Sequence, residues 1–183
     1  VTDGLAILDT MRSIKSPVAT IGMGMSASMG SFLLAAGTKG KRAMLPNATN
    51  MVHQIAGGSQ GKQRDMAGSL DFAKRLNNRL HLMYKQFCGF NNEEYKMLHQ
   101  MAKDDTYVNP LIAQKLGLID HIMKPAGYGK DPVITEEFDM LMDLYQHELD
   151  SIPDADPENI FDYDPNLQNY RIVKQIINSR EAR

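Results

Sequence analysis

The sequence has one cysteine, no long apolar run and no run of like charges, and each of these absences excludes a class of protein. Because Cys88 is the single cysteine of the 183 residues, internal disulfides are impossible. This fits the cytoplasm, with an organelle matrix or a virus-encoded protein left open. Charges interrupt every apolar stretch short of the ~20 residues of a membrane span, so no membrane association is expected. Basic residues are interspersed, and nucleic acid is not an expected partner.

The charge changes sign along the chain. Residues 1–130 hold 16 Lys/Arg against nine Asp/Glu, whereas residues 131–183 hold four against 13. We therefore expect two domains, a core over residues 1–124 and an acidic, partly disordered helical extension over residues 125–183.

Within the extension, two segments have amphipathic helical patterns, Thr135–Leu149 and Pro165–Arg180. Between them, Ser151–Pro165 is rich in proline and acidic residues, which predicts a linker that is disordered or ordered only on contact. Packing of this extension on its own core and docking of a partner are both open at this point.

The first third of the chain alternates short helical and strand patterns, which indicates an α/β core of parallel strands covered by helices. The expected helices are Leu5–Ile14 and Ser28–Ala36, and the expected strands are Val18–Met23, Ala43–Leu45 and Asn50–His53. Further on, the patterns predict helices over Asn92–Ala102 and Pro110–Lys115, a polar turn over Lys103–Tyr107 and an edge strand over Leu118–Ile122.

The longest helical pattern runs from Lys62 to Phe87 and is followed by Gly89 as a C-cap. Its apolar residues share one stripe: Met66, Leu70, Ala73, Leu76, Leu80, Met83 and Phe87. At ~1.5 Å per residue this helix is close to 40 Å long, too long to cover a small sheet alone. We expect it to pack on another subunit.

The strand–glycine–serine–helix pattern around Ser28 is typical of a turn that lifts a serine hydroxyl to the start of a helix. His53 is the last residue of the expected strand Asn50–His53 and could lie beside that hydroxyl. The alternative is a tightly packed turn, and Ser26 and Ser31 are interpreted as structural. The other histidines, His81, His99, His121 and His147, lack metal-ligand spacing; we predict a surface location for them and no metal site.

Residues 4–122 resemble the ClpP family, the proteolytic subunits of the ATP-dependent Clp protease. The matching segments are Gly4–Ile7, Asp9–Met11, Ala27–Ser31, Leu34–Gly37, Gly40–Arg42, Leu45–Asn47, Met51–Gln54, Gly57–Gly58 with Gly61, and Gly117–Asp120. They occur in the family's order and with nearly the family's spacing, and together they are specific.

The resemblance implies a serine endopeptidase with Ser28 as nucleophile and His53, 25 positions later, as general base. Asp105 is the implied third member of the triad, with Asp104 as its rival, because the segment before this turn is longer than is usual in the family. No cofactor is implied, and ATP is used by the partner unfoldase.

The resemblance also implies where substrate is held. Met29 would supply one backbone N–H of the oxyanion hole, and Ile55, Gly57 and Gly58 would bind the peptide as an added strand. The second oxyanion donor of the family is a Gly-Gly loop that would lie before Val1, as would its first strands and axial segment. If the chain as given is the entire polypeptide, we therefore expect severely reduced activity or none, whereas a longer protein that contains this loop should be active.

The implied fold is α/β, of the ClpP/crotonase type, with stacked short parallel strands, covering helices and a protruding handle of strand plus long helix over about residues 54–88. A helical C-terminal extension follows. The implied assembly is a homo-oligomer of heptameric rings stacked as a tetradecamer. It would degrade unfolded polypeptides delivered by an AAA+ unfoldase of the ClpX, ClpA or ClpC type.

Two alternatives to a serine endopeptidase are also compatible with the expected fold. A catalytically impaired ClpP-like structural subunit would keep the fold and the assembly without proteolysis. A crotonase-type acyl-CoA enzyme shares the fold but has no need of a serine and a histidine at this spacing.

Overall fold

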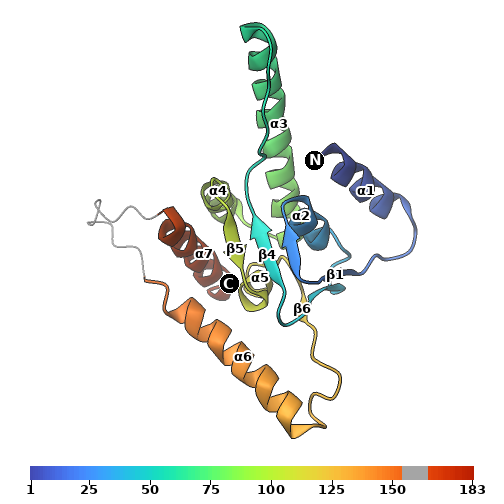
Figure 1. The fold of residues 1–183 in the computed structure, drawn as a ribbon, viewed down its shortest axis with the longest axis vertical. Coiled ribbons are helices and arrows are strands. Elements are labelled where there is room, and N and C mark those ends of the chain that lie inside the picture. Colours follow the sequence, from blue (N-terminus) through green and yellow to red (C-terminus); the bar gives the residue numbers. More distant parts are fainter. Residues whose placement is uncertain (154–164) are drawn as a thin grey trace.

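The computed structural model describes residues 1–153 and 165–183, the last range without the side chains of 165 and 166. Its helices are α1 (Thr2–Ser13), α2 (Met29–Ala35), α3 (Gln63–Cys88), α4 (Asn92–Met101), α5 (Pro110–Lys115), α6 (Pro132–Asp150) and α7 (Pro165–Glu181). Its strands are β1 (Thr20–Gly22), β2 (Met25–Ala27), β3 (Arg42–Met44), β4 (Thr49–Val52), β5 (Thr106–Val108) and β6 (His121–Ile122). Most of the predicted linker lies outside the described residues (Figure 1).

The strands form two three-stranded sheets. In the first, β3 lies between β1 and β6, and all pairs are parallel. In the second, β4 pairs in parallel with β2 and antiparallel with β5. This mixed arrangement with covering helices confirms the predicted α/β class. The strand β5 was missed, because its residues had been predicted as a polar turn, and pairing with β4 stabilises it as a strand.

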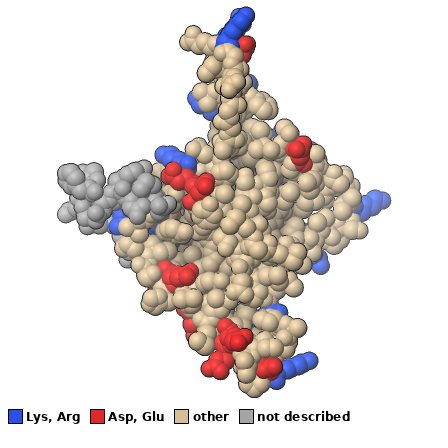
Figure 2. Space-filling model, in the orientation of Figure 1, with Lys and Arg blue, Asp and Glu red and all other residues tan. Residues whose placement is uncertain are grey.

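Helix α6 gathers acidic side chains on the face seen in Figure 2, as the sign change along the sequence predicts. It is bounded by Asp131, whose side chain accepts the Val133 N–H as N-cap, and by Ser151. None of the helices in the described ranges is long and apolar enough to cross a membrane.

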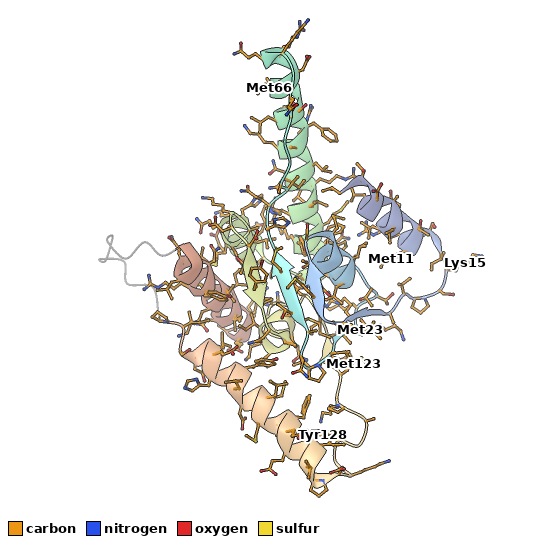
Figure 3. All side chains as sticks on the ribbon, viewed as in Figure 1. Met11, Lys15, Met23, Met66, Met123 and Tyr128 are labelled. Carbon is orange, nitrogen blue, oxygen red and sulfur yellow. The ribbon has the colours of Figure 1, made fainter. Side chains whose placement is uncertain are left out.

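Helix α3 projects from the body of the molecule as the predicted handle (Figure 1). It ends where expected, with Gly89 in the left-handed region at φ 71°. Met66 stands far out on it (Figure 3), and Leu70 and Phe72 are more than half exposed. The chain over residues 53–60 runs beside the helix without forming the expected strand, since no neighbouring strand of the described chain pairs with it.

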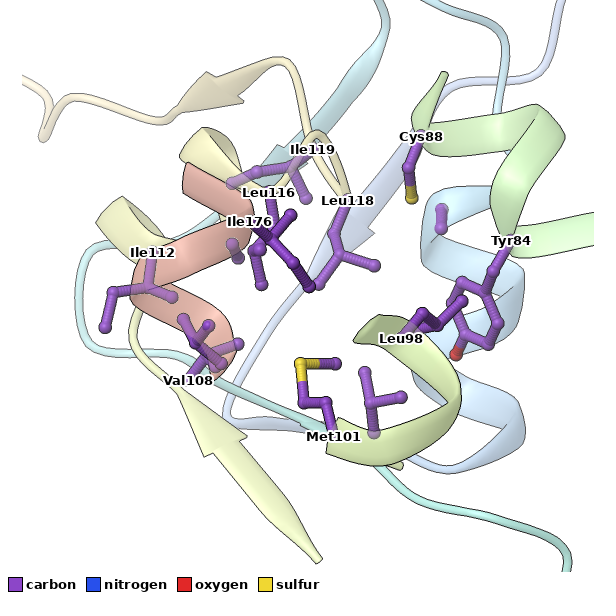
Figure 4. Packing of buried hydrophobic residues seen from close by; sticks show 14 of the residues in the cluster. Tyr84, Cys88, Leu98, Met101, Val108, Ile112, Leu116, Leu118, Ile119 and Ile176 are labelled. Carbon is purple, nitrogen blue, oxygen red and sulfur yellow. The ribbon is translucent and has the colours of Figure 1, made fainter. Parts of the chain in front are cut away.

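The core lies between the sheets and the helices α2, α3, α4, α5 and α7. Figure 4 shows Ile176 of α7 inserted among core residues of α5 and of the segment before β6. Val173, Ile176 and Ile177 are almost completely buried. The second helix of the acidic extension therefore shares the core, although the domain boundary placed at residue 124 stays a prediction.

Glu94 links α7 to α4. It completes a capping box with Asn91 at the start of α4, which confirms an expected helix start. Its carboxylate is fully buried and binds Arg183 Nη2 at 2.7 and 2.9 Å, and it accepts a hydrogen bond from Ser179. A buried carboxylate needs such partners, so the end of α7 fixes the start of α4.

The buried Arg42 forms an ion pair with Asp120, which is partly exposed. Arg42 Nε and Nη2 bind the two Asp120 oxygens at 2.9 and 2.6 Å. Arg42 Nη1 also donates to the carbonyls of Ala35 and Phe87. These hydrogen bonds from Arg42, with a backbone bond from Gly40, lower the pKa of Asp120 from 3.8 to about 2.

We predict that this pair gives the protein a pH-dependent stability. A carboxylate with a lowered pKa stabilises the fold fully above pH ~4, and about 2 kcal/mol of this is lost as the pH falls toward 2. In Asp120→Asn this pH-dependent part of the free energy of unfolding should vanish. At neutral pH the free energy of unfolding should fall by about 3 kcal/mol, because Arg42 loses its partner. Urea unfolding from pH 7 to 2 tests this, with the exposed Asp143→Asn as control. Parallel pH profiles for Asp120→Asn and the unmodified protein would contradict it.

Candidate active site

Ser28 occupies a strained turn between β2 and α2. Its φ of 55° and ψ of −118° make it the one non-glycine residue with positive φ in the described chain. Such a conformation costs about 1–3 kcal/mol and persists only where the surroundings enforce it. The turn presents the Ser28 side chain at the start of α2, as the sequence predicts.

Buried hydrogen bonds enforce this turn. The Ser28 N–H donates to the Met51 carbonyl at 3.0 Å, which continues the pairing of β2 with β4. Three residues on, Ser31 donates to Asn50 Oδ1 at 2.9 Å and accepts from the Tyr84 hydroxyl at 3.0 Å. Burial raises the pKa of Tyr84, so this hydroxyl keeps its proton. Strand β4 and helix α3 thus hold the first turn of α2.

His53 follows β4 and reaches the Ser28 side chain. Its Nε2 lies 2.8 Å from Ser28 Oγ. The next residue fixes the chain here, because the Gln54 N–H donates to the Ala102 carbonyl and its side-chain amide donates to the Lys103 carbonyl at 3.0 Å. The chain after β4 is therefore tied to the turn between α4 and β5.

That turn brings Asp105 to the other side of the imidazole. Asp105 Oδ1 lies 3.3 Å from His53 Nδ1, and the Asp105 side chain is 56% exposed against 19% for His53. The structure thus brings together the three residues that the sequence singled out, and it pairs His53 with Asp105 rather than with Asp104. With a proton on Nδ1 facing Asp105, Nε2 is free to accept the Ser28 hydroxyl proton.

The remaining site residues lie around this group. The Met29 N–H precedes the first intrahelical bond of α2, from the Phe32 N–H to the Ser28 carbonyl, and so has no partner within the helix. The Ile55 N–H donates to Asn77 Oδ1 of α3 at 3.0 Å, which holds the chain that leads to Gly57 and Gly58. At both glycines a Cβ would meet nothing within 4 Å, so their backbone is open to an approaching chain.

A small cavity of about 80 Å³ opens beside Ser28 and His53. Phe32 and Leu80 supply apolar walls, and His81 also lines it. The predicted surface location of His81 is wrong, since this side chain is only 3% exposed. The last third of α3 packs between α2 and α4, which buries a wider face than the single stripe predicted from the sequence. In the described residues no three His, Cys, Asp or Glu side chains gather as a metal site would need.

We predict that Ser31, unlike its neighbour Ser26, is needed to hold the Ser28 turn. Ser31→Ala would leave the Tyr84 hydroxyl and Asn50 Oδ1 buried without a partner and should lower the free energy of unfolding by about 2 kcal/mol. Ser26 is also buried, but its side chain makes no hydrogen bond within the described part of the chain. Ser26→Ala is therefore the matched control, with an expected change below about 1 kcal/mol. Equal urea midpoints for the two variants would contradict the assignment.

The comparison with known families agrees with this geometry. A family model described as Clp protease matches residues 1–126, more than two thirds of the chain. The match spans α1 to β6 and includes the serine turn, the histidine after β4 and the turn before β5. It favours a peptidase over the acyl-CoA enzymes that share the fold. The chain belongs to the Clp protease family.

Proposed function

We propose that this protein is a serine endopeptidase that cleaves unfolded polypeptides, with Ser28 as nucleophile, His53 as general base and Asp105 as the residue that orients His53. The observation that carries the proposal is the alignment of the three side chains, with 2.8 Å between Ser28 Oγ and His53 Nε2 and 3.3 Å between His53 Nδ1 and Asp105 Oδ1. Within a Clp protease family chain, this alignment suits acyl transfer.

In the first half of the reaction, Ser28 Oγ attacks the carbonyl carbon of the scissile peptide bond while His53 Nε2 takes the hydroxyl proton. Negative charge develops on the carbonyl oxygen, and the Met29 N–H is available to stabilise it. When the C–N bond breaks, His53 returns the proton to the leaving amine, and the acyl group stays on Ser28 as an ester.

In the second half, a water molecule attacks the ester carbonyl as His53 takes one of its protons. The C–O bond to Ser28 breaks, the serine recovers its proton from His53, and a carboxylic acid leaves. Asp105 stabilises the imidazolium in both halves without itself taking the proton. Its exposure makes this help weaker than that of a buried carboxylate, because water screens the charge.

The shape of the site favours an extended substrate. The open glycine backbone beyond Ile55 can pair with a substrate strand, whereas folded domains present few free strands. Unfolded polypeptides are therefore the proposed substrates, and an AAA+ unfoldase of the ClpX, ClpA or ClpC type is the proposed source of them.

We also propose that α3 joins subunits into stacked heptameric rings. Its outer part exposes the apolar side chains of Met66 and Leu70, and a groove of about 440 Å³ runs between it and the Gly57–Ser59 backbone. Exposed apolar residues along a projecting helix are typical of a surface that another chain covers.

We predict that a fluorophosphonate probe labels the assembled protein at Ser28 and that Ser28→Ala abolishes the labelling. Removal of the nucleophile should also reduce peptide hydrolysis to background. Asp105→Asn should lower kcat, but by less than the roughly 10⁴-fold seen for a buried triad aspartate, because Asp105 is exposed; the neighbouring Asp104→Asn is the control. Labelling is read by mass spectrometry of the modified peptide.

The catalytically impaired subunit is the alternative outcome of the same experiment. An assembled protein that takes up no probe and hydrolyses no peptide would overturn the peptidase. Equal effects of Asp104→Asn and Asp105→Asn would overturn the choice of the third triad member.

For the assembly, we predict that Leu70→Asp shifts the protein to smaller species, measured by light scattering during size-exclusion chromatography. A charge in a covered apolar contact loses hydration without gaining a partner. Arg79→Asp, on the opposite side of the same helix, is the control for introducing an aspartate and should leave the mass unchanged. An unchanged mass for Leu70→Asp would remove α3 from the interface.

A further inference from the structure

Helix α6 has an apolar stripe on the side that faces away from the core. Its inward side is fixed by Phe138 and Leu149, which are buried. At ~100° per residue, Val133, Met140 and Leu144 lie together on the opposite side of the helix, and they are 62%, 65% and 52% exposed. We call these three residues the α6 stripe. Apolar side chains aligned in this way are typical of a surface that another chain covers.

Acidic side chains border the α6 stripe. The segment Pro132–Asp150 contains six Asp or Glu residues and no Lys or Arg. Glu137 lies in line with the stripe, and Glu136 and Asp143 lie beside it. In the described part of the chain, none of these three carboxylates forms an ion pair with a lysine or an arginine. The outer side of α6 therefore combines exposed apolar area with uncompensated negative charge.

The sheet of β1, β3 and β6 has an exposed apolar face. Because side chains alternate along a strand, Ile21 and Met23 share one face at β1, and Met123 lies on the same face after β6. These three side chains are 50%, 66% and 38% exposed. Met23 and Met123 lie close together in Figure 3. We call these three residues the sheet face.

Positive charge surrounds the sheet face. Lys39 and Lys41 precede β3, Lys124 follows β6, and all three are exposed. The same polarity holds along the whole sequence, since residues 1–130 have a net charge of +7 and residues 131–183 a net charge of −9. The sheet face and the α6 stripe are thus both apolar at their centres and opposite in charge at their borders, as complementary interfaces are.

The two surfaces also agree in size and adaptability. The α6 stripe extends over ~16 Å, at ~1.5 Å per residue. Three strands ~4.8 Å apart place β1 and β6 ~10 Å from each other, and the side chains at both edges widen the sheet face. Methionine supplies two of the three residues of the sheet face and one of the stripe. Its flexible side chain adapts to an irregular partner surface.

We propose that the α6 stripe of one copy of this chain docks on the sheet face of a second copy. Within one copy the two surfaces do not cover each other, since all of their side chains are exposed. The contact joins unlike surfaces, so repeated head to tail it can close a ring. It is separate from the contact proposed for α3 and independent of the chemistry at Ser28. Only its place within a ring rests on the proposed function.

Photo-cross-linking identifies the occupant directly. In the full chain, Met140 is replaced with p-benzoylphenylalanine, and protein co-assembled from unlabelled and ¹⁵N-labelled copies is irradiated. We expect cross-linked peptides that join the two isotopic forms and contain residues 18–25 or 121–124. Gln146, which is half-exposed and lies on another side of α6, is the control position and should give no cross-link to these peptides. Cross-links within one chain only, cross-links to other segments of the second copy, or none at all would overturn the inference.

A charge placed in the stripe gives a second measurement. Leu144→Lys sets a positive charge against the lysines around the sheet face, and we expect it to lower the mass of the assembled species in light scattering during size-exclusion chromatography. Gln146→Lys is the matched control and should leave the mass unchanged. An unchanged mass for Leu144→Lys, or an equal loss for both variants, overturns the inference. Probe labelling at Ser28 and the mass of Leu70→Asp test the proposed function separately.

Discussion

The guanidinium of Arg42 connects the first sheet with two of the helices that cover it. It joins β3, which carries it, to Asp120 before β6, and it reaches the ends of α2 and α3 through the Ala35 and Phe87 carbonyls. A lysine could not make these bonds, since it lacks the planar set of five donors. The helix that begins at the serine turn and the helix that lines the cavity are thus held by one side chain.

The site itself combines rigid and exposed parts. Ser28 and His53 follow paired strands and rest on buried hydrogen bonds, so the 2.8 Å contact between them is held by the core. Asp105 lies on a more exposed turn that is held through Gln54 and through the packing of α4. Of the three side chains, the one on this turn is therefore the most exposed to solvent.

The local sequence pattern was sufficient to predict some features of the site but not others. Glycines and small residues around Ser28 can form only a tight turn, and apolar runs on both sides define its strand and helix, so this region was predictable. β5 was not, because Thr106–Val108 becomes a strand only through β4. The burial of His81 depends equally on tertiary contact, since α4 places His99 against it. The sequence also gave no sign that the carboxylate of Glu94 would be buried under Arg183.

The place of α7 in the core has a consequence for how the protein is made. A ribosome releases residues in order, at roughly 5–20 per second, and domains fold when their contacts are available. Val173, Ile176 and Ile177 are synthesised long after the strands that they cover. The buried carboxylate of Glu94 has no contact with Arg183 until that residue, 89 positions later, has been added. During synthesis, α4 and the turn after it therefore lack their covering helix. The turn that carries Asp105 therefore reaches its final surroundings only after α7 has been made.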